Sequence, residues 1–200
     1  LIEYVILEAV NFGLYKLTDA RMSFYLSTLL LIYVYVMRFY WQNRKDRIRK
    51  NRLLIGAPAF FCILAVACQI FYIPTDARWQ KINSVLSGRL ELGCFGWRDY
   101  GFSLLGTKIE WIGFSHNATA GTYNYVDCSY MQILLENGLI PLVIIIAVYT
   151  YIMYMAVKEK DFYLQTAVLL ITAFSITEPR LLNLAYNPLP FFGITYISLR

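Results

Sequence analysis

Three arginines lie next to apolar runs of the chain, and their chemistry suits a bound anion. Arg21 begins one apolar run, Arg89 lies in a mixed stretch, and Arg180 follows another run. A guanidinium stays charged at any relevant pH and binds phosphate through two parallel hydrogen bonds. These arginines predict a phosphate or pyrophosphate site if the fold brings them to one surface. The alternative is that each pairs with a nearby acid, such as Asp19 or Glu178.

Two other side chains have the chemistry of a general base. Asp127 lies just before an apolar segment, and His116, the only histidine, lies in a polar one. Either could take a proton from a hydroxyl group, and we rank Asp127 first and His116 second. The sequence leaves two alternatives open. Asp127 could cap a helix in which Ser129 and Gln132 form a capping box, and His116 could be a solvated loop residue.

Metal and nucleotide chemistry find no support in the sequence. Phosphate-loop, HExxH and paired CxxC patterns are absent, and the single histidine has no second ligand nearby. We therefore expect no metal and no cofactor. Cys62 and Cys68 lie in an apolar run and are expected to be packing residues. Cys94 and Cys128 either pair or remain free.

Composition indicates an integral membrane protein. The 200 residues are 58% hydrophobic, 17% aromatic and only 16% charged. Soluble domains have about 45–50% apolar and about 25% charged residues. The aromatic content excludes a disordered chain, and four cysteines are too few for a disulfide scaffold. A bilayer partner is expected, and nucleic acid is not.

Apolar runs of about 17–25 residues predict membrane-spanning helices. We expect an all-α, polytopic transmembrane bundle in which residues 1–200 form a single membrane domain. Because the chain opens inside an apolar run without a methionine, we expect it to be the C-terminal portion of a longer protein. The last span contains Pro188 and Pro190 and is the weakest. The predicted spans are about 1–17, 22–39, 53–73, 139–157, 162–177 and 184–199.

Basic residues predict the orientation of these spans. Segment 38–52 is rich in arginine and lysine and has one acid, Asp46, which is typical of a cytoplasmic loop. Segment 158–161, with two lysines, falls on the same side. The turns at 18–21 and 178–180 and the long segment 74–127 are then external. All the candidate site residues lie in these external segments or at their borders.

The external segment predicts an amphipathic helix and an aromatic loop. Residues 79–92 fit one helix lying along the membrane surface, with Arg89 inside its apolar face. Alternatively, Gly88 ends the helix and Arg89 snorkels to water. Five glycines from Gly93 to Gly113 predict turns among aromatic residues, which suit a membrane interface or stacking on sugar rings. Tyr100 and Tyr130 are the candidates for contact with a glycan.

An ordered set of short motifs resembles one enzyme family. The motifs are Leu86-Ser87-Gly88-Arg89, Tyr100-Gly101-Phe102-Ser103-Leu104-Leu105-Gly106, Tyr125-Val126-Asp127-Cys128-Ser129-Tyr130 and Leu134-Leu135-Glu136-Asn137-Gly138-Leu139-Ile140. The turns Thr18-Asp19-Ala20-Arg21 and Glu178-Pro179-Arg180 add to the set. Together they resemble the Wzy-type polymerases of O-antigen and capsular polysaccharide repeat units, over nearly all of the chain. In the first turn, Ala20 replaces the family's usual serine.

The resemblance implies a function and a set of partners. Such proteins are multi-pass enzymes of the bacterial cytoplasmic membrane with a glycosyltransferase C-like helical fold and an external catalytic loop, here about residues 74–127. They join oligosaccharide units carried on undecaprenyl pyrophosphate, without a nucleotide sugar or a metal. Arg21, Arg89 and Arg180 would bind the pyrophosphate, and Asp127 or His116 would act as the base. Pathway partners would be a flippase and a chain-length regulator.

Other functions remain as alternatives. An O-antigen ligase uses the same lipid donor and a different acceptor, whereas a flippase moves the lipid-linked glycan without forming a bond. A membrane scaffold would perform no chemistry. Transporters more often place charge within their spans or show paired repeats. Here the charges cluster outside the spans, which favours an enzyme.

Overall fold

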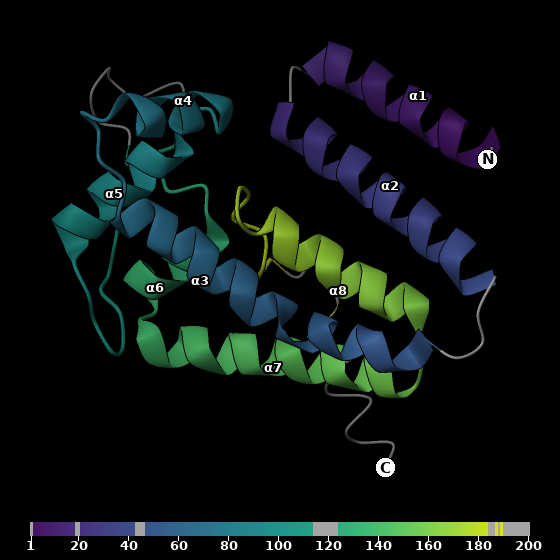
Figure 1. Cartoon of the computed structure of the whole chain (residues 1–200). Helices are drawn as coiled ribbons and strands as arrows, with labels where there is room; N and C mark the ends of the chain where they lie inside the picture. Colours follow the sequence, from purple (N-terminus) through teal and green to yellow (C-terminus); the bar gives the residue numbers. More distant parts are fainter. Residues whose placement is uncertain are drawn as a thin grey trace.

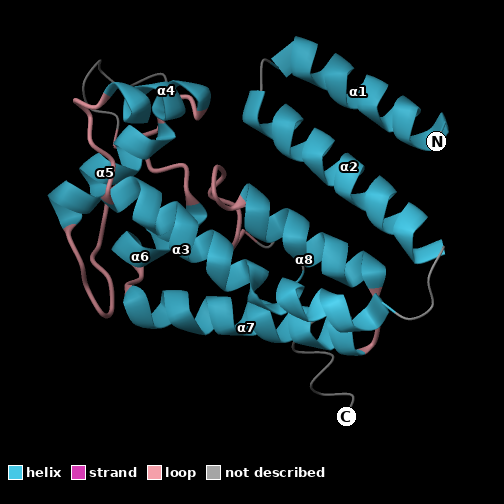
Figure 2. Ribbon diagram, viewed as in Figure 1, coloured by secondary structure: helices cyan, strands magenta, loops and turns pink. Residues whose placement is uncertain are grey.

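The computed structural model describes residues 2–18, 21–42, 47–113, 124–183, 187 and 189. Within these ranges the chain forms eight α-helices and one 3-10 segment, without a strand (Figure 2). The predicted all-α class is therefore confirmed for this part of the chain. His116 lies outside the described residues, as does almost all of the predicted span 184–199, and only the backbone of Arg21 is described.

The long apolar helices form a bundle in which successive helices run in alternating directions (Figure 1). Helix α8 lies against α2, α3 and α7, and α3 also packs on α7, whereas α1 packs on α2. Their bounds agree with five of the predicted apolar segments. The helices are α1 (Ile2–Thr18), α2 (Arg21–Gln42), η1 (Arg47–Gly56), α3 (Ala57–Ile70), α7 (Leu139–Lys158) and α8 (Phe162–Phe174).

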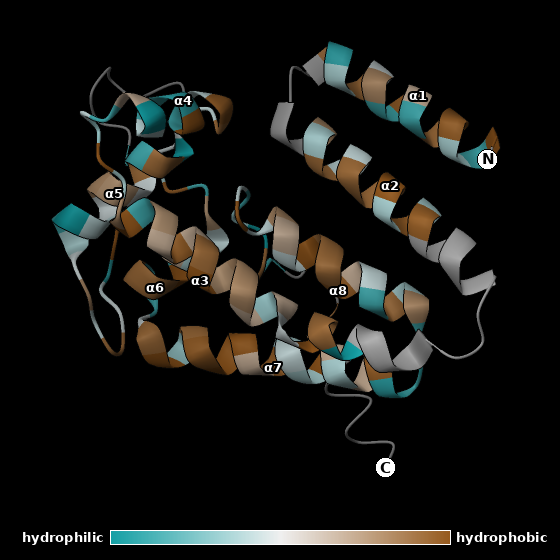
Figure 3. Ribbon diagram, in the orientation of Figure 1, coloured by the Kyte–Doolittle hydropathy of each residue, from teal (hydrophilic) through white to brown (hydrophobic). Residues whose placement is uncertain are grey.

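Two stretches of the described residues are long and apolar enough to cross a membrane. These are Arg52–Ile70, with 19 residues, and Leu139–Lys158, with 20. The central helix of a soluble protein can pass the same test, but it is mostly buried. Here only 22% and 39% of the two apolar windows are buried. Figure 3 shows that α3 and α7 consist largely of hydrophobic residues, and their low burial favours association with a membrane.

The predicted single helix over residues 79–92 is wrong. The structure has two helices there, α4 (Ala77–Val85) and α5 (Arg89–Tyr100). Between them Ser87 and Gly88 have φ angles of 55° and 84°, which a continuous helix does not allow. The side chain of Asn83 then caps α5, because its Oδ1 accepts hydrogen bonds from the backbone N–H groups of Leu90 and Glu91 at 3.1 and 3.2 Å. Arg89 is consequently the first residue of α5.

Two of the glycines expected to form turns lie inside α5. A Cβ atom at Gly93 would be 1.6 Å from Gln69 Oε1 of α3. A Cβ atom at Gly96 would be 3.0 Å from side-chain carbons of Leu135 and Val126. These glycines therefore allow α5 to lie directly against α3 and α6 (Ser129–Glu136).

From Gly101 to Gly113 the chain is an irregular loop, as predicted, and backbone groups attach it to α7. The N–H groups of Leu139 and Ile140 donate to the carbonyls of Ser103 and Leu104 at 3.0 and 3.1 Å. Gly138 has a φ of 94°, and a Cβ there would lie 2.4 Å from the backbone nitrogen of Gly106. This contact, which we call the backbone clasp, fixes the loop against the start of α7.

Candidate functional site

Four charged side chains from distant parts of the sequence meet in one group. Arg89 Nε lies 3.4 Å from Asp127 Oδ2, and Arg89 Nη2 donates a hydrogen bond of 3.4 Å to Glu178 Oε1. Arg180 Nε lies 3.7 Å from Glu178 Oε2. We call Arg89, Asp127, Glu178 and Arg180 the charged cluster. Three of them are predicted site residues, and the structure brings them together.

Three different elements position the charged cluster. Arg89 begins α5, Asp127 lies in the extended segment before α6, and the other two residues lie in the turn that follows α8. Arg89, Asp127 and Glu178 expose 20%, 26% and 21% of their side chains, and Arg180 exposes 53%. Partial burial strengthens the attraction between opposite charges compared with open water. The arrangement leaves Arg180 as the most accessible cation.

The two carboxylates hold Arg89 differently. Glu178 accepts a hydrogen bond from Arg89, whereas Asp127 makes only a close ionic contact with it. The N–H group at Arg89 Nε is buried and has no hydrogen-bond acceptor in the described part of the chain. The contact between Arg89 and Asp127 is therefore the weaker of the two.

The pKa of Asp127 is shifted from that of an ordinary aspartate. Burial raises its pKa, and the neighbouring Arg89 only partly opposes this effect. A carboxylate beside an arginine usually has a lowered pKa, so desolvation dominates here. The result is a more basic carboxylate, which is the property that a general base needs.

The predicted helix cap at Asp127 is wrong. The N-cap of α6 is Cys128, and no side chain caps this helix. The hydroxyl group of Ser129 instead donates to the carbonyl of Glu178 at 2.5 Å and accepts from the N–H of Leu181 at 3.1 Å. Ser129 is 2% exposed. It therefore attaches the turn that carries Glu178 and Arg180 to the segment that carries Asp127.

We predict that Ser129→Ala lowers both stability and activity. The substitution removes the hydroxyl group from the buried N–H of Leu181 and the partly buried carbonyl of Glu178, and leaving a buried group unsatisfied costs about 1–3 kcal/mol. Denaturant unfolding of the protein in detergent micelles measures the loss. The control is Ser84→Ala, because the hydroxyl of Ser84 makes one exposed hydrogen bond, to the carbonyl of Lys81. Equal stability of the two variants would show that Ser129 does not hold the turn.

The two tyrosines predicted to contact a glycan have different environments. Tyr130 is 0% exposed, and its hydroxyl donates to the carbonyl of Thr172 at 2.7 Å. Its predicted contact with a glycan is wrong, because the ring has no accessible surface. Tyr100 is half-buried, and its hydroxyl accepts a hydrogen bond of 2.9 Å from Asn124 Nδ2.

Tyr100 belongs to a row of three partly exposed aromatic rings. Its ring meets that of Trp111 edge-on at 6.1 Å, and Trp111 meets Tyr125 in the same way at 6.0 Å. The indole N–H of Trp111 donates to Glu136 Oε2 at 3.0 Å, which fixes the ring. Tyr125 is two residues from Asp127. Trp111 and Tyr125 were not among the residues that the sequence predicted to contact a glycan.

The four cysteines are free thiols, so Cys94 and Cys128 do not pair. Both are buried, and Cys94 Sγ contacts the carbonyl of Tyr72 at 3.8 Å. Among the residues that the structure describes, no group of three histidine, cysteine or acidic side chains could hold a metal ion.

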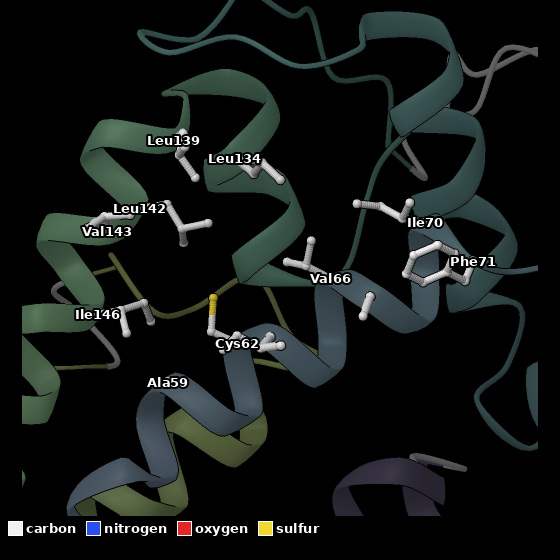
Figure 4. Close-up of a pocket in the computed structure, with 12 residues that line it drawn as sticks. Ala59, Cys62, Val66, Ile70, Phe71, Leu134, Leu139, Leu142, Val143 and Ile146 are labelled. Atoms are coloured by element: carbon white, nitrogen blue, oxygen red, sulfur yellow. The ribbon is translucent and has the colours of Figure 1, made fainter.

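Two cavities flank α3. A groove of about 450 Å³ lies between α3, α6 and α7, and its walls are apolar along their whole length (Figure 4). Ile63, Val66 and Leu134 are among its lining residues, and no member of the charged cluster is. A smaller cavity of about 170 Å³ lies on another side of α3, and Arg89 forms part of its wall.

No family model, curated protein or solved structure matches the chain. The interpretation of the charged cluster therefore depends on its geometry and chemistry.

Proposed function

We propose that the chain is a membrane glycosyltransferase of the Wzy type, which polymerises oligosaccharide repeat units carried on undecaprenyl pyrophosphate. Its active site is the charged cluster. The observation that carries this proposal is the meeting of two guanidinium groups and two carboxylates from three segments, beside a bundle with exposed apolar helices. A lipid-linked pyrophosphate needs both features, because its head is anionic and its tail is a hydrocarbon.

The arrangement of helix ends supports a site at the outer face of the bacterial cytoplasmic membrane. The end of α3 and the start of α7 lie at one end of the bundle, together with α4, α5 and α6 (Figure 1). The end of α7 and the start of α8 lie at the other end, which carries Lys158 and Lys160. Basic residues favour the cytoplasmic side, so the charged cluster faces outward in this orientation.

The chemistry of the reaction matches the roles of the four side chains. A hydroxyl oxygen of the acceptor sugar attacks the anomeric carbon of the donor, and the bond from that carbon to the pyrophosphate oxygen breaks. The electron pair of this bond leaves with the pyrophosphate, where Arg89 and Arg180 stabilise the added negative charge. Asp127 takes the proton of the attacking hydroxyl. Glu178 holds both guanidinium groups in place.

Binding of the donor requires one contact within the charged cluster to open. A pyrophosphate competes with the carboxylates for the guanidinium groups. The contact between Arg89 and Asp127 lacks a hydrogen bond, so it is the weaker one. When this contact opens, Arg89 can bind the phosphate and Asp127 can accept the proton of the acceptor hydroxyl. Glu178 keeps its hydrogen bond and the orientation of Arg89.

An elongation assay tests this function. The purified protein is incubated with lipid-linked repeat units, and the products are separated by length. Longer glycans on the lipid carrier are the expected result. Transfer to another acceptor would indicate a ligase, and movement of unextended units across a vesicle membrane would indicate a transporter. Either of these outcomes without elongation contradicts the proposal.

A further inference from the structure

An extended segment leads from the charged cluster to three aromatic rings, which we call the aromatic row: Tyr100, Trp111 and Tyr125. In this segment Val126 and Cys128 are 0% and 1% exposed. Tyr125 and Asp127 alternate with them and are partly exposed. Side chains alternate between the two sides of an extended chain, so Tyr125 and Asp127 lie on the same, outer side. Their Cα atoms are about 7 Å apart, because an extended chain rises about 3.3 Å per residue.

The aromatic row continues away from the charged cluster. Arg89 is the first residue of α5 and Tyr100 is the last. An α-helix rises about 1.5 Å per residue, so the Cα atoms of these two residues lie about 16 Å apart. In the other direction, Ser129 attaches the end of the extended segment to the carbonyl of Glu178. Asp127 therefore lies between the charged turn on one side and the aromatic row on the other.

The protein fixes the polar ends of two of the rings. The indole N–H of Trp111 donates to Glu136 Oε2 at 3.0 Å, and Asn124 Nδ2 donates to the hydroxyl of Tyr100 at 2.9 Å. Asn124 Oδ1 also accepts from the N–H of Ile112 at 2.7 Å, which joins the extended segment to the loop that carries Trp111. A surface whose rings are already ordered loses little conformational entropy when a ligand binds.

The polar groups beside the rings indicate the class of ligand. The carboxylate of Glu136 is exposed next to Trp111, and the hydroxyl of Tyr100 accepts from Asn124, so its own proton can be donated. A carboxylate repels phosphate, whereas it accepts hydrogen bonds from hydroxyl groups. A neutral sugar suits both features. The C–H groups of its ring pack on the negative face of an aromatic ring, and its hydroxyl groups bond to the polar groups.

The aromatic row differs from the side chains that suit a membrane surface. Phe102, Leu104 and Leu105 in the neighbouring loop are 55%, 56% and 77% exposed and apolar. Aromatic residues at a membrane interface turn their polar ends to water or lipid headgroups. In Trp111 and Tyr100 these ends are bound to protein side chains instead.

We propose that the aromatic row binds the acceptor glycan. The attacking hydroxyl lies at Asp127, and the sugars that follow it lie over Tyr125 and Trp111 in the direction of Tyr100. This proposal rests on the proposed function and adds the binding site of the second substrate. Because the row contains three rings, it accommodates an oligosaccharide rather than one sugar. The pyrophosphate of the donor and the glycan of the acceptor then occupy different sides of Asp127.

Binding of two probes to the full chain in nanodiscs tests the proposal. One probe is the repeat-unit oligosaccharide, released from its lipid carrier and free of phosphate, and the other is inorganic pyrophosphate. Trp111→Ala is expected to weaken oligosaccharide binding about tenfold or more, the usual value of one large buried apolar group. It should leave pyrophosphate binding unchanged. Arg89→Ala should have the opposite pair of effects, and calorimetry measures both.

Two further variants supply the controls. Trp111→Phe keeps an aromatic face and lacks the indole N–H, so it should retain most of the affinity for the oligosaccharide. Phe102→Ala removes an exposed ring from the same loop and should bind both probes like the wild type. Unchanged pyrophosphate binding by Trp111→Ala shows that this variant is folded.

Several results would overturn the proposal. These are no oligosaccharide binding by the wild type, wild-type affinity in Trp111→Ala, or weaker binding of both probes in that variant, which would indicate a role in the fold. An equal loss in Phe102→Ala would indicate a role at the membrane interface. In each case, pyrophosphate binding that depends on Arg89 leaves the proposed anion site standing. If Trp111→Ala alone weakens oligosaccharide binding but pyrophosphate binding does not depend on Arg89, the aromatic row stands and the anion site fails.

Discussion

Arg89→Ala is expected to reduce glycan elongation by about 10²–10³-fold, the usual cost of removing one group that stabilises charge in a transition state. Arg89→Lys should lose nearly as much. Lysine keeps the positive charge but cannot donate the two parallel hydrogen bonds that a guanidinium offers to phosphate. It also cannot reach Asp127 and Glu178 with two separate nitrogens, as Arg89 does at 3.4 Å each. The measurement is the initial rate of elongation with lipid-linked repeat units.

The control for Arg89 is Arg78→Ala. Arg78 has a side chain that is 90% exposed and pairs with the nearby Asp76 at 3.3 Å. Its removal should leave the rate unchanged. Because Arg89→Ala removes the cation that contacts Asp127 and leaves Glu178 with Arg180, the expression level and unfolding temperature of each variant are measured in parallel. Wild-type elongation by both Arg89 variants at normal expression would exclude Arg89 from the active site.

Asp127→Asn is expected to lower the elongation rate by about 10²–10⁴-fold, the range that a general base contributes. The same variant should be at least as stable as the wild type near neutral pH. The pKa of Asp127 is raised by burial, so the folded state favours the protonated form. Its contribution to stability is fully present below the pKa of the unfolded chain and is lost as the pH rises through the raised folded pKa. A neutral asparagine avoids this loss.

The pH profile gives a second measurement on Asp127. The wild-type rate should fall as the pH is lowered through the raised pKa, above the usual range of an aspartate. Asp76→Asn is the matched control, because the side chains of Asp76 and Asp127 are 28% and 26% exposed, whereas the pKa of Asp76 is lowered by hydrogen bonds from Arg78. Asparagine caps helices well, so this control should keep its rate and stability. If Asp127→Asn keeps the wild-type rate and pH profile, Asp127 is not the base.

Hydropathy was sufficient to predict most of the helices. Runs such as 139–157 are so uniformly apolar that the bounds of α7 follow within about a residue, which is within the usual uncertainty of helix ends. The sequence indicated the break near Gly88 only as an alternative to one helix, because the apolar face of 79–92 continues across it. The prediction of turns at Gly93 and Gly96 was wrong for another reason. Glycine permits turns, but it also permits close helix packing, and only the positions of α3 and α6 decide between the two.

Three of the four members of the charged cluster were predicted as site residues, but the contacts between them were not. Arg89, Asp127 and Arg180 stood out as charges near apolar runs. Glu178 was treated as a local partner, although it meets Arg89 across 89 positions of sequence. The role of Ser129 was hidden because a serine at the start of a helix usually caps it. No pattern in the sequence distinguished buried Tyr130 from half-buried Tyr100.

The backbone clasp between the loop 101–113 and the start of α7 has a consequence for how the protein can diversify. Its hydrogen bonds join carbonyl and N–H groups, which every residue except proline possesses. Gly106 and Gly138 are constrained by space and by positive φ, and Ser103 is constrained by the hydrogen bonds of its hydroxyl group with the backbone of Gly106. Phe102, Leu104 and Leu105 are 55%, 56% and 77% exposed, so they are free to change identity while the loop keeps its place. Substitutions at these three positions could change the surface that the loop presents while the backbone clasp and the helices stay the same.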